Sequence, residues 1–408
     1  MNITELQQSY ASHPNVEGVC RLLKDNSVRH LYCGGLYASA ASLFSSVLVQ
    51  RATCPLVFIL GDMEEAGYFY HDLTQILGTE QVLFFPSSFR RAIKYGQKDA
   101  ANEILRTEVL SRLQKGEEGL CVVTYPDALA EKVVSRKELG DNTLKLHAGE
   151  RVDMNFVTDV LRSYGFEYVD YVYEPGQYAV RGSIIDVFSF SSEYPFRIDF
   201  FGDEVESVRT FEVETQLSKE KKESIVIVPD LSHSLEKKGS GGMVSFLDFL
   251  PSDSLLAMRD FLWLRERIQT VHDESLTPQA IAARESEENG AITLEGKLID
   301  GGEFTLRALD FRRMEFGNKP TGTPDATVSF HTTVQPIFHK NFDMVAESFR
   351  EYLSRHYTIY ICSDSLKQTD RIRAIFEDRG DNISFTAVER TLHEGFADDT
   401  LRICVFTD

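Results

Sequence analysis

A turn near the start of the chain has the sequence position of a phosphate-binding loop. Gly34 and Gly35 follow a short apolar run and precede a helix-like stretch. Glycines in such a turn let the backbone approach phosphate oxygens, and a following Lys and Ser or Thr bind the β- and γ-phosphates and Mg²⁺. Here no Lys follows and Tyr37 adds bulk, while the single Gly-Lys pair of the chain, Gly296-Lys297, lies in a strand-like context. We therefore expect a nucleotide-binding shape without ATP hydrolysis, with no catalytic residue and no bound cofactor.

Carboxylates crowd a second stretch, where Asp199, Asp203, Glu204 and Glu206 lie close together in sequence. Paired acids can hold a metal or transfer protons, but the outward side chains of an alternating strand give the same pattern. No His or Cys lies close enough in sequence to complete a ligand set. None of the 10 histidines has a recognisable catalytic spacing to a Ser, Cys or acid. We expect no metal site.

Cysteine usage and the absence of long apolar runs indicate the compartment. No two of the cysteines form a Cys-x-x-Cys pair, which is typical of a reduced protein without structural zinc. The six are Cys20, Cys33, Cys54, Cys121, Cys362 and Cys404. No apolar run reaches about 18 residues, and the start of the chain lacks a basic region followed by an apolar stretch. We expect a cytoplasmic protein with no membrane span and no secretory signal.

The net charge opposes binding of DNA by the surface as a whole. At −20 over 408 residues, the chain repels phosphate backbones at long range, which favours protein partners or simple solubility. Arg90, Arg91 and Lys94 form a short basic segment that could contact a phosphate. A solvated loop is the simpler interpretation of so short a run.

Alternating strands and helices must position these residues. Strand-like runs lie at 31–35, 55–61, 82–86 and 120–124, with helix-like segments at 38–49, 64–77 and 102–113. The alternation continues over 246–250, 255–258 and 261–271. Such a pattern predicts a parallel α/β sheet, whose first strand-to-helix turn is where phosphates are commonly held.

Residues 173–209 follow a different pattern. The run 178–188 is dense in β-forming residues, and 196–200 alternates apolar and charged residues as a half-buried strand does. Gly202-Asp203 suits a tight reversal into the next apolar residues. This stretch predicts a small antiparallel sheet.

The same stretch carries a resemblance to a known family. It contains an aromatic residue, one further residue and then Val-Arg-Gly (178–182), an Asp before Val-Phe (186–188), and Arg-Ile-Asp-Phe-Phe-Gly-Asp-Glu (197–204). In this it resembles the second domain of the nucleotide-excision-repair protein UvrB and the equivalent module of the transcription-repair coupling factor Mfd. The resemblance implies a docking surface for UvrA, the damage-recognition ATPase, with no catalytic group of its own.

The resemblance places an interface arginine at Arg181. Arginine is frequent at interface centres because its planar fork binds carboxylates through two hydrogen bonds. Tyr178, Phe166 and Phe188 are predicted to pack beside it, although any of them could belong to the core instead. Tyr168 completes the predicted set of UvrA contacts.

Two departures from the family pattern affect the exact contacts. UvrB has a second arginine where this chain has Ala179, and a further basic position of the relatives falls on Glu167 or Tyr168. These differences affect the affinity and the exact contacts more than the choice of partner.

The resemblance also explains the phosphate-loop remnant. UvrB has a helicase-like first domain with a true P-loop, whereas the matching domain of Mfd is a degenerate copy. The DNA-clamping hairpin of UvrB corresponds here only to the short stretch 86–96. The alternative interpretation is a fragment of a UvrB-like ATP-dependent DNA repair helicase, which would require the missing Lys and hairpin.

The predicted fold class is α/β: a degenerate helicase/P-loop-like parallel sheet domain, an inserted small α+β docking domain, and a small α/β domain. The boundaries are 1–127 and 214–324 for the split first domain, 128–213 for the insertion, and 325–408 for the last domain, whose role is not readable. The apolar run 224–229 is expected to re-enter the first sheet, and the Gly/Pro-rich segment 317–324 to be a linker. The chain stops directly after a strand, as a piece of a longer protein would.

The resulting functional hypothesis is non-catalytic. The chain is expected to imitate UvrB and recruit UvrA to stalled RNA polymerase in transcription-coupled nucleotide excision repair, and to act in autoinhibition when this surface is masked. Binding of RNA polymerase, DNA and ATP is assigned by the resemblance to domains absent from this sequence.

Overall fold

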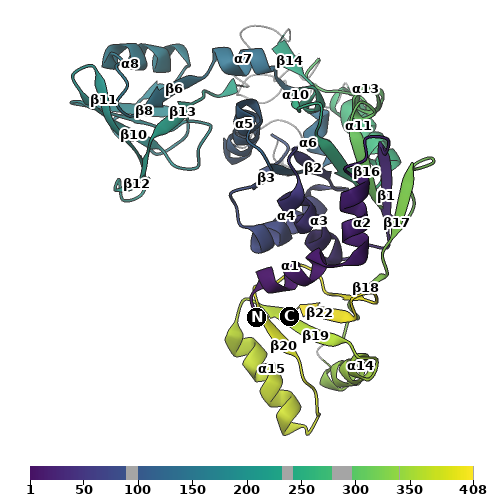
Figure 1. The fold of residues 1–408 in the computed structure, drawn as a ribbon. Coiled ribbons are helices and arrows are strands. Elements are labelled where there is room, and N and C mark those ends of the chain that lie inside the picture. Colours follow the sequence, from purple (N-terminus) through teal and green to yellow (C-terminus); the bar gives the residue numbers. More distant parts are fainter. Residues whose placement is uncertain (89–99, 232–241, 278–295, 340, 408) are drawn as a thin grey trace.

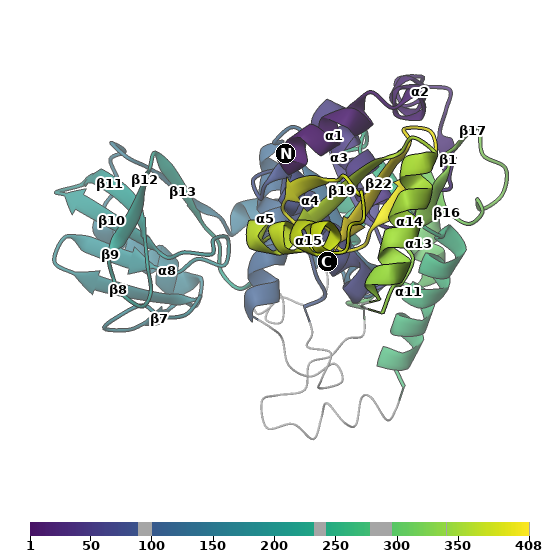
Figure 2. The same ribbon diagram turned by 90° about the horizontal axis from the view of Figure 1, so that it is seen from below.

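The computed structural model describes residues 1–88, 100–231, 242–277, 296–339 and 341–407. The basic segment with Arg90, Arg91 and Lys94 lies outside the described residues. The chain forms a central body, a module that projects from it, and a last domain that packs on the opposite end (Figure 1). Seen from below, the module stands apart from the body while the last domain lies over it (Figure 2).

The body is built on a seven-stranded parallel sheet with the order β17-β1-β16-β15-β2-β4-β3. Continuous apolar runs form these strands because helices cover both faces of the sheet. The strands are β1 (His30–Gly34), β2 (Leu56–Ile59), β3 (Val82–Phe85), β4 (Cys121–Thr124), β15 (Leu255–Met258), β16 (Arg312–Gly317) and β17 (Ala326–Ser329). The predicted parallel α/β domain is confirmed.

Helices flank this sheet in two groups, one near the chain start and one that combines α6, which precedes the module, with helices that follow it. In the first, α3 packs against α1 and α4, and in the second α11 packs against α6 and α13. The helices are α1 (Ile3–Ala11), α2 (Pro14–Leu22), α3 (Ala40–Arg51), α4 (Met63–Leu77), α5 (Ala100–Lys115), α6 (Pro126–Ala130), α7 (Arg136–Asp141), α10 (Phe246–Phe249), α11 (Phe261–Ser275) and α13 (Gly301–Ala308).

The module contains a six-stranded sheet with the order β12-β11-β10-β9-β8-β7, covered on one face by α8 (Met154–Ser163). Apolar residues at every second position face α8 and make one core, which includes Val157, Leu161, Ile185 and Ile198. The strands are β7 (Glu167–Tyr168), β8 (Gln177–Arg181), β9 (Ile184–Val187), β10 (Phe196–Phe201), β11 (Glu204–Phe211) and β12 (Ser218–Lys222). Apart from the parallel pair β7–β8, neighbouring strands are antiparallel, as expected from the sequence.

The expectation that 224–229 re-enters the first sheet is wrong. Strand β13 (Ser224–Ile227) pairs with β6 (Leu144–His147), and Ile225 and Ile227 belong to the module core. A short apolar run predicts a buried strand but not its partner, which here lies some eighty residues earlier in sequence. A second pair, β5 (Val133–Val134) with β14 (Met243–Val244), also joins the entering and leaving chain segments. The module therefore extends beyond its predicted end at 213.

The last domain has a five-stranded mixed sheet with the order β18-β21-β22-β19-β20. Two helices, α14 (Phe342–Ser354) and α15 (Leu366–Asp378), pack against β19. The strands are β18 (Thr332–Val334), β19 (Thr358–Ser363), β20 (Thr386–Glu389), β21 (Phe396–Asp398) and β22 (Ile403–Thr407). A small α/β unit, as expected, follows the body.

The predicted linker 317–324 does not separate two domains. It connects β16 to β17, and both strands pair with β1 in the sheet of the body. The body therefore continues to Ser329, a few residues past the expected boundary at 324. Gly and Pro mark a loop, and loops within a sheet and between domains use the same residues.

Among the described helices, none combines the length and apolar character needed to cross a lipid bilayer.

Candidate docking surface

The face of the module turned away from α8 carries a row of charged side chains in register. Asp186 on β9 lies opposite Arg197 on β10, which lies opposite Arg209 on β11, which lies opposite Lys221 on β12. Directly opposed residues on neighbouring strands have Cβ atoms roughly 5 Å apart. Side chains alternate along a strand, so residues two positions apart share a face. Asp199 lies two positions after Arg197, and Arg181 lies two positions after the residue of β8 that is opposite Asp186. Both therefore point to the same face as the row. We call these six residues the ladder face.

The carboxylate of Asp186 organises the centre of the ladder face. It is only 1% exposed. Arg197 donates to it twice, from Nε to Oδ1 at 2.7 Å and from Nη2 to Oδ2 at 2.9 Å. Arg181 donates a further hydrogen bond from Nη2 to the same carboxylate. Two guanidinium groups on one buried carboxylate leave an excess positive charge that water reaches only partly.

The guanidinium group of Arg197 is held by several contacts besides those with Asp186. Its Nη1 donates to the carbonyl oxygen of Gln216 at 3.1 Å, and its guanidinium lies 4.5 Å from the ring centroid of Phe211. Hydrogen bonding to Asp186 raises the pKa of Arg197 above its usual value, against the opposing effect of burial. This arginine is charged and immobile, which lowers the entropy cost of binding an acidic partner.

Arg181 is held but remains accessible. Its side chain is 37% exposed, and its guanidinium carbon lies 5.1 Å from the ring centroid of the exposed Tyr171. The hydrogen bond to Asp186 uses one edge of the fork. The remaining donors are free to meet a carboxylate of another molecule in the bidentate arrangement that arginine favours.

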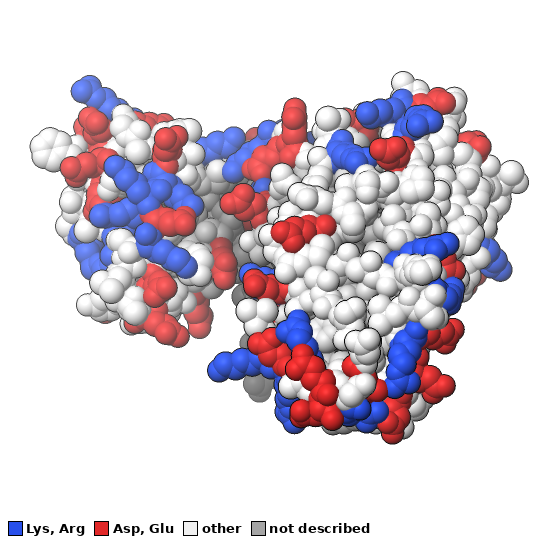
Figure 3. All heavy atoms as spheres, turned by 60° about the horizontal axis from the view of Figure 1, so that its bottom comes forward, with Lys and Arg blue, Asp and Glu red and all other residues white. Residues whose placement is uncertain are grey.

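The ladder face is cationic although the chain is acidic. Arg209 pairs with Asp199, which also accepts a hydrogen bond from the Ser207 hydroxyl at 3.0 Å. Of the six residues of the ladder face, four carry a positive and two a negative charge, so two positive charges are in excess. Figure 3 shows Lys and Arg side chains gathered on the middle of the module, with acidic side chains around them.

Phe201 adds an aromatic anchor at the edge of this face. It is 80% exposed and ends β10 just before the hairpin at Gly202. Phe200 points into the module core, so Phe201 points to the opposite side, which is the side of the ladder face. A bulge between Asp199 and Phe200 shifts the register at this position. Exposed aromatic and arginine side chains side by side are the composition of interface hot spots.

The sequence did not predict Arg197 or Phe201 as contact residues. The alternation over 196–200 places Arg197 on the outer side of a strand, and Phe201 enters only through the family motif 197–204. The available signal was the doublet Phe200-Phe201, which breaks the alternation by placing two large aromatic side chains on opposite faces. An alternating strand that ends in such a doublet must expose one of the two.

The structure separates the predicted contact residues. Tyr178 and Phe166 are buried in the core under α8, and Phe188 is buried in a small cluster on the other side of the sheet. Burial removes these three from direct contact with a partner. Tyr168 is 59% exposed, but it lies opposite Tyr178 and packs edge-on against its ring, with the centroids 5.5 Å apart. It therefore faces the α8 side, and only Arg181 of the five lies on the ladder face.

The acidic residues and the cysteines are further possible chemical groups of the chain. In the described part of the chain, no group of three or more His, Cys, Asp or Glu side chains could hold a metal ion. Burial raises the pKa of the Cys33 and Cys121 thiols far above the usual range, so these thiols stay protonated and unreactive. None of the six cysteines, all of which lie in the described residues, takes part in a disulfide bond.

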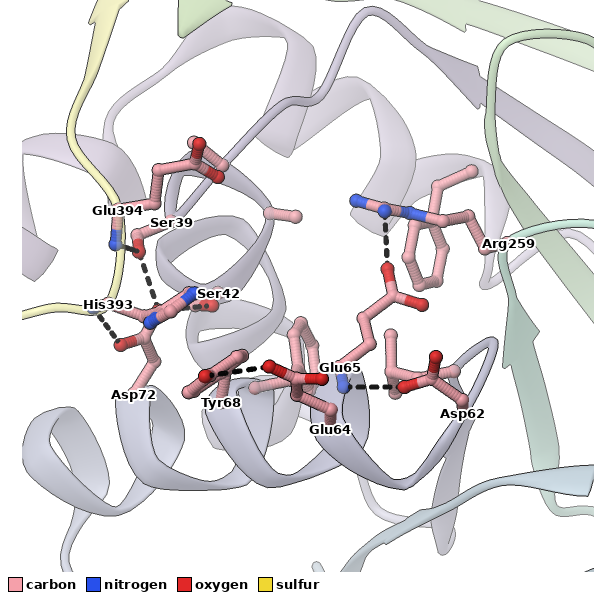
Figure 4. Close-up of a pocket in the computed structure, with 15 residues that line it drawn as sticks. Ser39, Ser42, Asp62, Glu64, Glu65, Tyr68, Asp72, Arg259, His393 and Glu394 are labelled. Atoms are coloured by element: carbon pink, nitrogen blue, oxygen red, sulfur yellow. Dashed lines mark hydrogen bonds and ion pairs between the residues drawn. The ribbon is translucent and has the colours of Figure 1, made fainter. Parts of the chain in front are cut away.

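A pocket of about 280 Å³ lies beside the phosphate-loop remnant, at the carboxyl ends of the strands of the body (Figure 4). Its one arginine, Arg259, forms an ion pair with Glu65. Five carboxylate side chains line it: Asp62, Glu64, Glu65, Asp72 and Glu394. Such a lining repels the negative charges of a triphosphate.

Comparisons with known proteins single out the module as a whole. Residues 144–233 match the family described as the UvrB interaction domain, a range that begins at β6 and runs just past β13. The chain is 29% identical over 198 residues to the transcription-repair-coupling factor of Escherichia coli K12, a match covering 48% of this chain and 17% of that protein. It is 30% identical over 196 residues to the Bacillus subtilis protein of the same name, covering 48% of the chain and 16% of the relative.

A longer but weaker similarity extends over most of the chain. The transcription-repair-coupling factor of Staphylococcus aureus RF122 is 22% identical over 416 aligned residues, which cover 89% of this chain and 35% of that protein. The matches thus span about a third or less of the relatives' own length. The projecting module thus matches the UvrB interaction domain, and most of the chain is similar to part of the transcription-repair-coupling factors.

Proposed function

We propose that the ladder face docks UvrA, and that the chain thereby recruits this repair protein as part of a transcription-repair coupling factor. The match of residues 144–233 to the UvrB interaction domain supports the choice of module. The names of the relatives support the setting, transcription-coupled repair. Stalled RNA polymerase and DNA would be engaged by parts of the longer protein outside this chain.

One observation carries the proposal. The Asp186 carboxylate accepts hydrogen bonds from Arg181 and Arg197 on a face that also exposes Phe201. The arrangement offers preorganised cations and an aromatic side chain that is almost wholly open to solvent. Its complement is a partner surface with carboxylates around an apolar recess.

In this proposal the body contributes its UvrB-like fold and has no catalytic role. It keeps a parallel sheet and the turn of a nucleotide-binding domain, as UvrB mimicry requires, while the turn lacks a Lys and the adjoining pocket is lined by acids. The rival, a UvrB-like ATP-dependent helicase fragment, requires saturable ATP binding by the body. Masking of the ladder face by another part of the longer protein would make the same surface autoinhibitory.

The decisive experiment truncates the aromatic anchor. We expect Phe201→Ala to weaken the affinity of the chain for purified UvrA at least about tenfold, because an exposed anchor at a hot spot contributes more than 1.4 kcal/mol. Phe156 on α8 is the matched control, since it is also exposed but lies on the helix that covers the other face of the sheet. Titration calorimetry with both variants would measure the difference. Equal affinities for wild type and Phe201→Ala would reject the ladder face as the docking surface.

A further inference from the structure

Polar groups of the turn that resembles a phosphate loop are already hydrogen-bonded to another part of the chain. Between β1 and α3 it runs from Gly34 to Ser39, and the segment from Phe330 to Thr332 crosses directly over it. The Phe330 amide donates to the Gly34 carbonyl oxygen at 2.8 Å. The buried Thr332 hydroxyl donates to the Gly35 carbonyl oxygen at 2.7 Å and accepts from the Tyr37 amide at 2.9 Å.

A second segment of the last domain reaches the start of α3. The Ser39 amide donates to the Glu394 carbonyl oxygen at 3.2 Å, and the Glu394 amide donates back to the Ser39 hydroxyl at 3.1 Å. Asp72 on α4 accepts from the Ser39 hydroxyl at 2.6 Å and from the His393 amide at 2.7 Å. The His393 ring stacks on Tyr68 with the centroids 3.5 Å apart. Figure 4 shows these groups converging at one end of the pocket.

These contacts use the groups that a phosphate would need. In a nucleotide-binding domain, the amides of this turn and of the following helix start point at phosphate oxygens. Here the Tyr37 and Ser39 amides are taken by a hydroxyl and a carbonyl oxygen of residues beyond 329. A Cβ at Gly35, where φ is +77°, would lie 2.0 Å from the Phe330 carbonyl oxygen. The glycine thus permits close approach of this chain's own backbone.

We propose that the last domain is a built-in ligand of the phosphate turn, holding the body in one nucleotide-free conformation. In this role the segments 330–332 and 393–394 replace the phosphates, and the missing Lys is only part of the loss of nucleotide binding. The proposal gives residues 330–407 a function that their sequence does not reveal.

A wider interface supports a permanent attachment. The core of the body includes Val388, Leu392, Phe396 and Val405 from the last domain. The amino group of Met1 donates to the Ala387 carbonyl oxygen at 3.2 Å, so the chain start is also tied to this domain. In Figure 1 the two chain ends lie close together at this junction.

Amide hydrogen exchange of the intact chain tests the proposal. We expect the Tyr37 and Ser39 amides to exchange on the order of a hundredfold more slowly than in an unstructured peptide. Adding millimolar Mg-ATP should leave their exchange unchanged, because these two amides are already bonded to acceptors of the last domain. Unprotected amides in the wild type, or saturable slowing by Mg-ATP, would each overturn the proposal without any variant.

A matched pair of variants identifies the contact responsible. Thr332→Val keeps the shape but removes the hydroxyl that bonds both Gly35 and Tyr37, so exchange at Tyr37 should become about fivefold faster or more. Thr333→Val changes the exposed neighbour, whose side chain points to the other side of β18, and should leave the exchange at Tyr37 as in the wild type. Equal exchange rates at Tyr37 in the two variants would contradict the assignment.

Discussion

At the scale of single residues, the docking proposal depends on how one buried carboxylate fixes two arginines. Asp186 neutralises one guanidinium, and the other charge stays available at the surface. The predicted neighbours Tyr178, Phe166 and Phe188 turned out to be core residues. Sequence alternation shows that two faces exist, but it does not show which face a helix such as α8 will cover. The prediction of Arg181 rests on its motif and not on periodicity, and it stays a prediction.

Arg181 should be an energetic hot spot for UvrA. Arg181→Ala is expected to weaken UvrA binding by about 2 kcal/mol or more, because the free donors of its fork are placed for a partner carboxylate. Arg162→Ala is the control for charge, since this exposed arginine lies on α8 and bonds the Tyr178 hydroxyl on the other face. Binding isotherms should show a loss only for Arg181. Similar losses for both arginines would indicate long-range attraction instead of a specific contact.

Asp186 should be more important for stability than any exposed acid of the module. Asp186→Asn leaves Arg181 and Arg197 without their shared counter-charge in a buried site, which we expect to cost about 3 kcal/mol of unfolding free energy. Asp203→Asn, in the exposed hairpin, should change it by less than about 0.5 kcal/mol. Chemical denaturation followed by circular dichroism would compare them. A stable Asp186→Asn protein would show that the clamp is dispensable for folding.

At the scale of elements, the sequence predicted the strands and helices of the body well and their long-range partners poorly. Apolar runs such as 56–59 and 121–124 are buried on both faces, so their type was evident. The run 224–227 has the same composition, yet it pairs with β6 in the module. The Gly/Pro-rich segment 317–324 looked like a domain boundary but joins two strands of one sheet. Pairing between distant strands is decided by packing, which local composition does not encode.

The turn after β1 should tolerate no side chain at its second glycine. Gly35→Ala would adopt an unfavourable positive φ and place its Cβ against the Phe330 carbonyl oxygen, so we expect a loss of about 2 kcal/mol or more in unfolding free energy. Gly18→Ala in α2 is the opposite case, because nothing lies within 4 Å of its Cβ. That change should stabilise the protein by about 0.5–1 kcal/mol through helix propensity. Thermal melts of both variants test the contrast, and a neutral Gly35→Ala would contradict the close approach.

At the scale of the whole molecule, the body and the last domain share one core, and the module, which we propose as the docking part, stands apart. The junction of the first two contains a buried acid, Asp398, which accepts from the Tyr10 hydroxyl at 2.7 Å and lies 3.5 Å from His13 Nε2. The other ring nitrogen of His13 accepts from the Asn15 amide at 3.0 Å, so the Nε2 hydrogen is directed to Asp398. This network joins the first two helices to the last sheet.

The protonation of Asp398 should therefore control how firmly the last domain is attached. Burial opposes its ionisation, but the adjacent His13 ring and the hydrogen bonds from the Leu401 amide and the Tyr10 hydroxyl outweigh this and lower the pKa of the carboxyl below its usual 3.8. A lowered folded pKa means that the ionised group stabilises the fold fully above 3.8, and that this contribution is lost as pH falls through the folded value.

Asp398→Asn should consequently lower the melting temperature at pH 7, and the gap between variant and wild type should shrink as pH falls below 3.8. Asp399→Asn, at the neighbouring position, is the control because its carboxylate bonds Tyr357 within the last domain. Calorimetric scans from pH 7 to pH 3 would measure both. A gap for Asp398→Asn that stays constant over this range would mean that the residue acts through shape, and that its charge does not hold the two domains together.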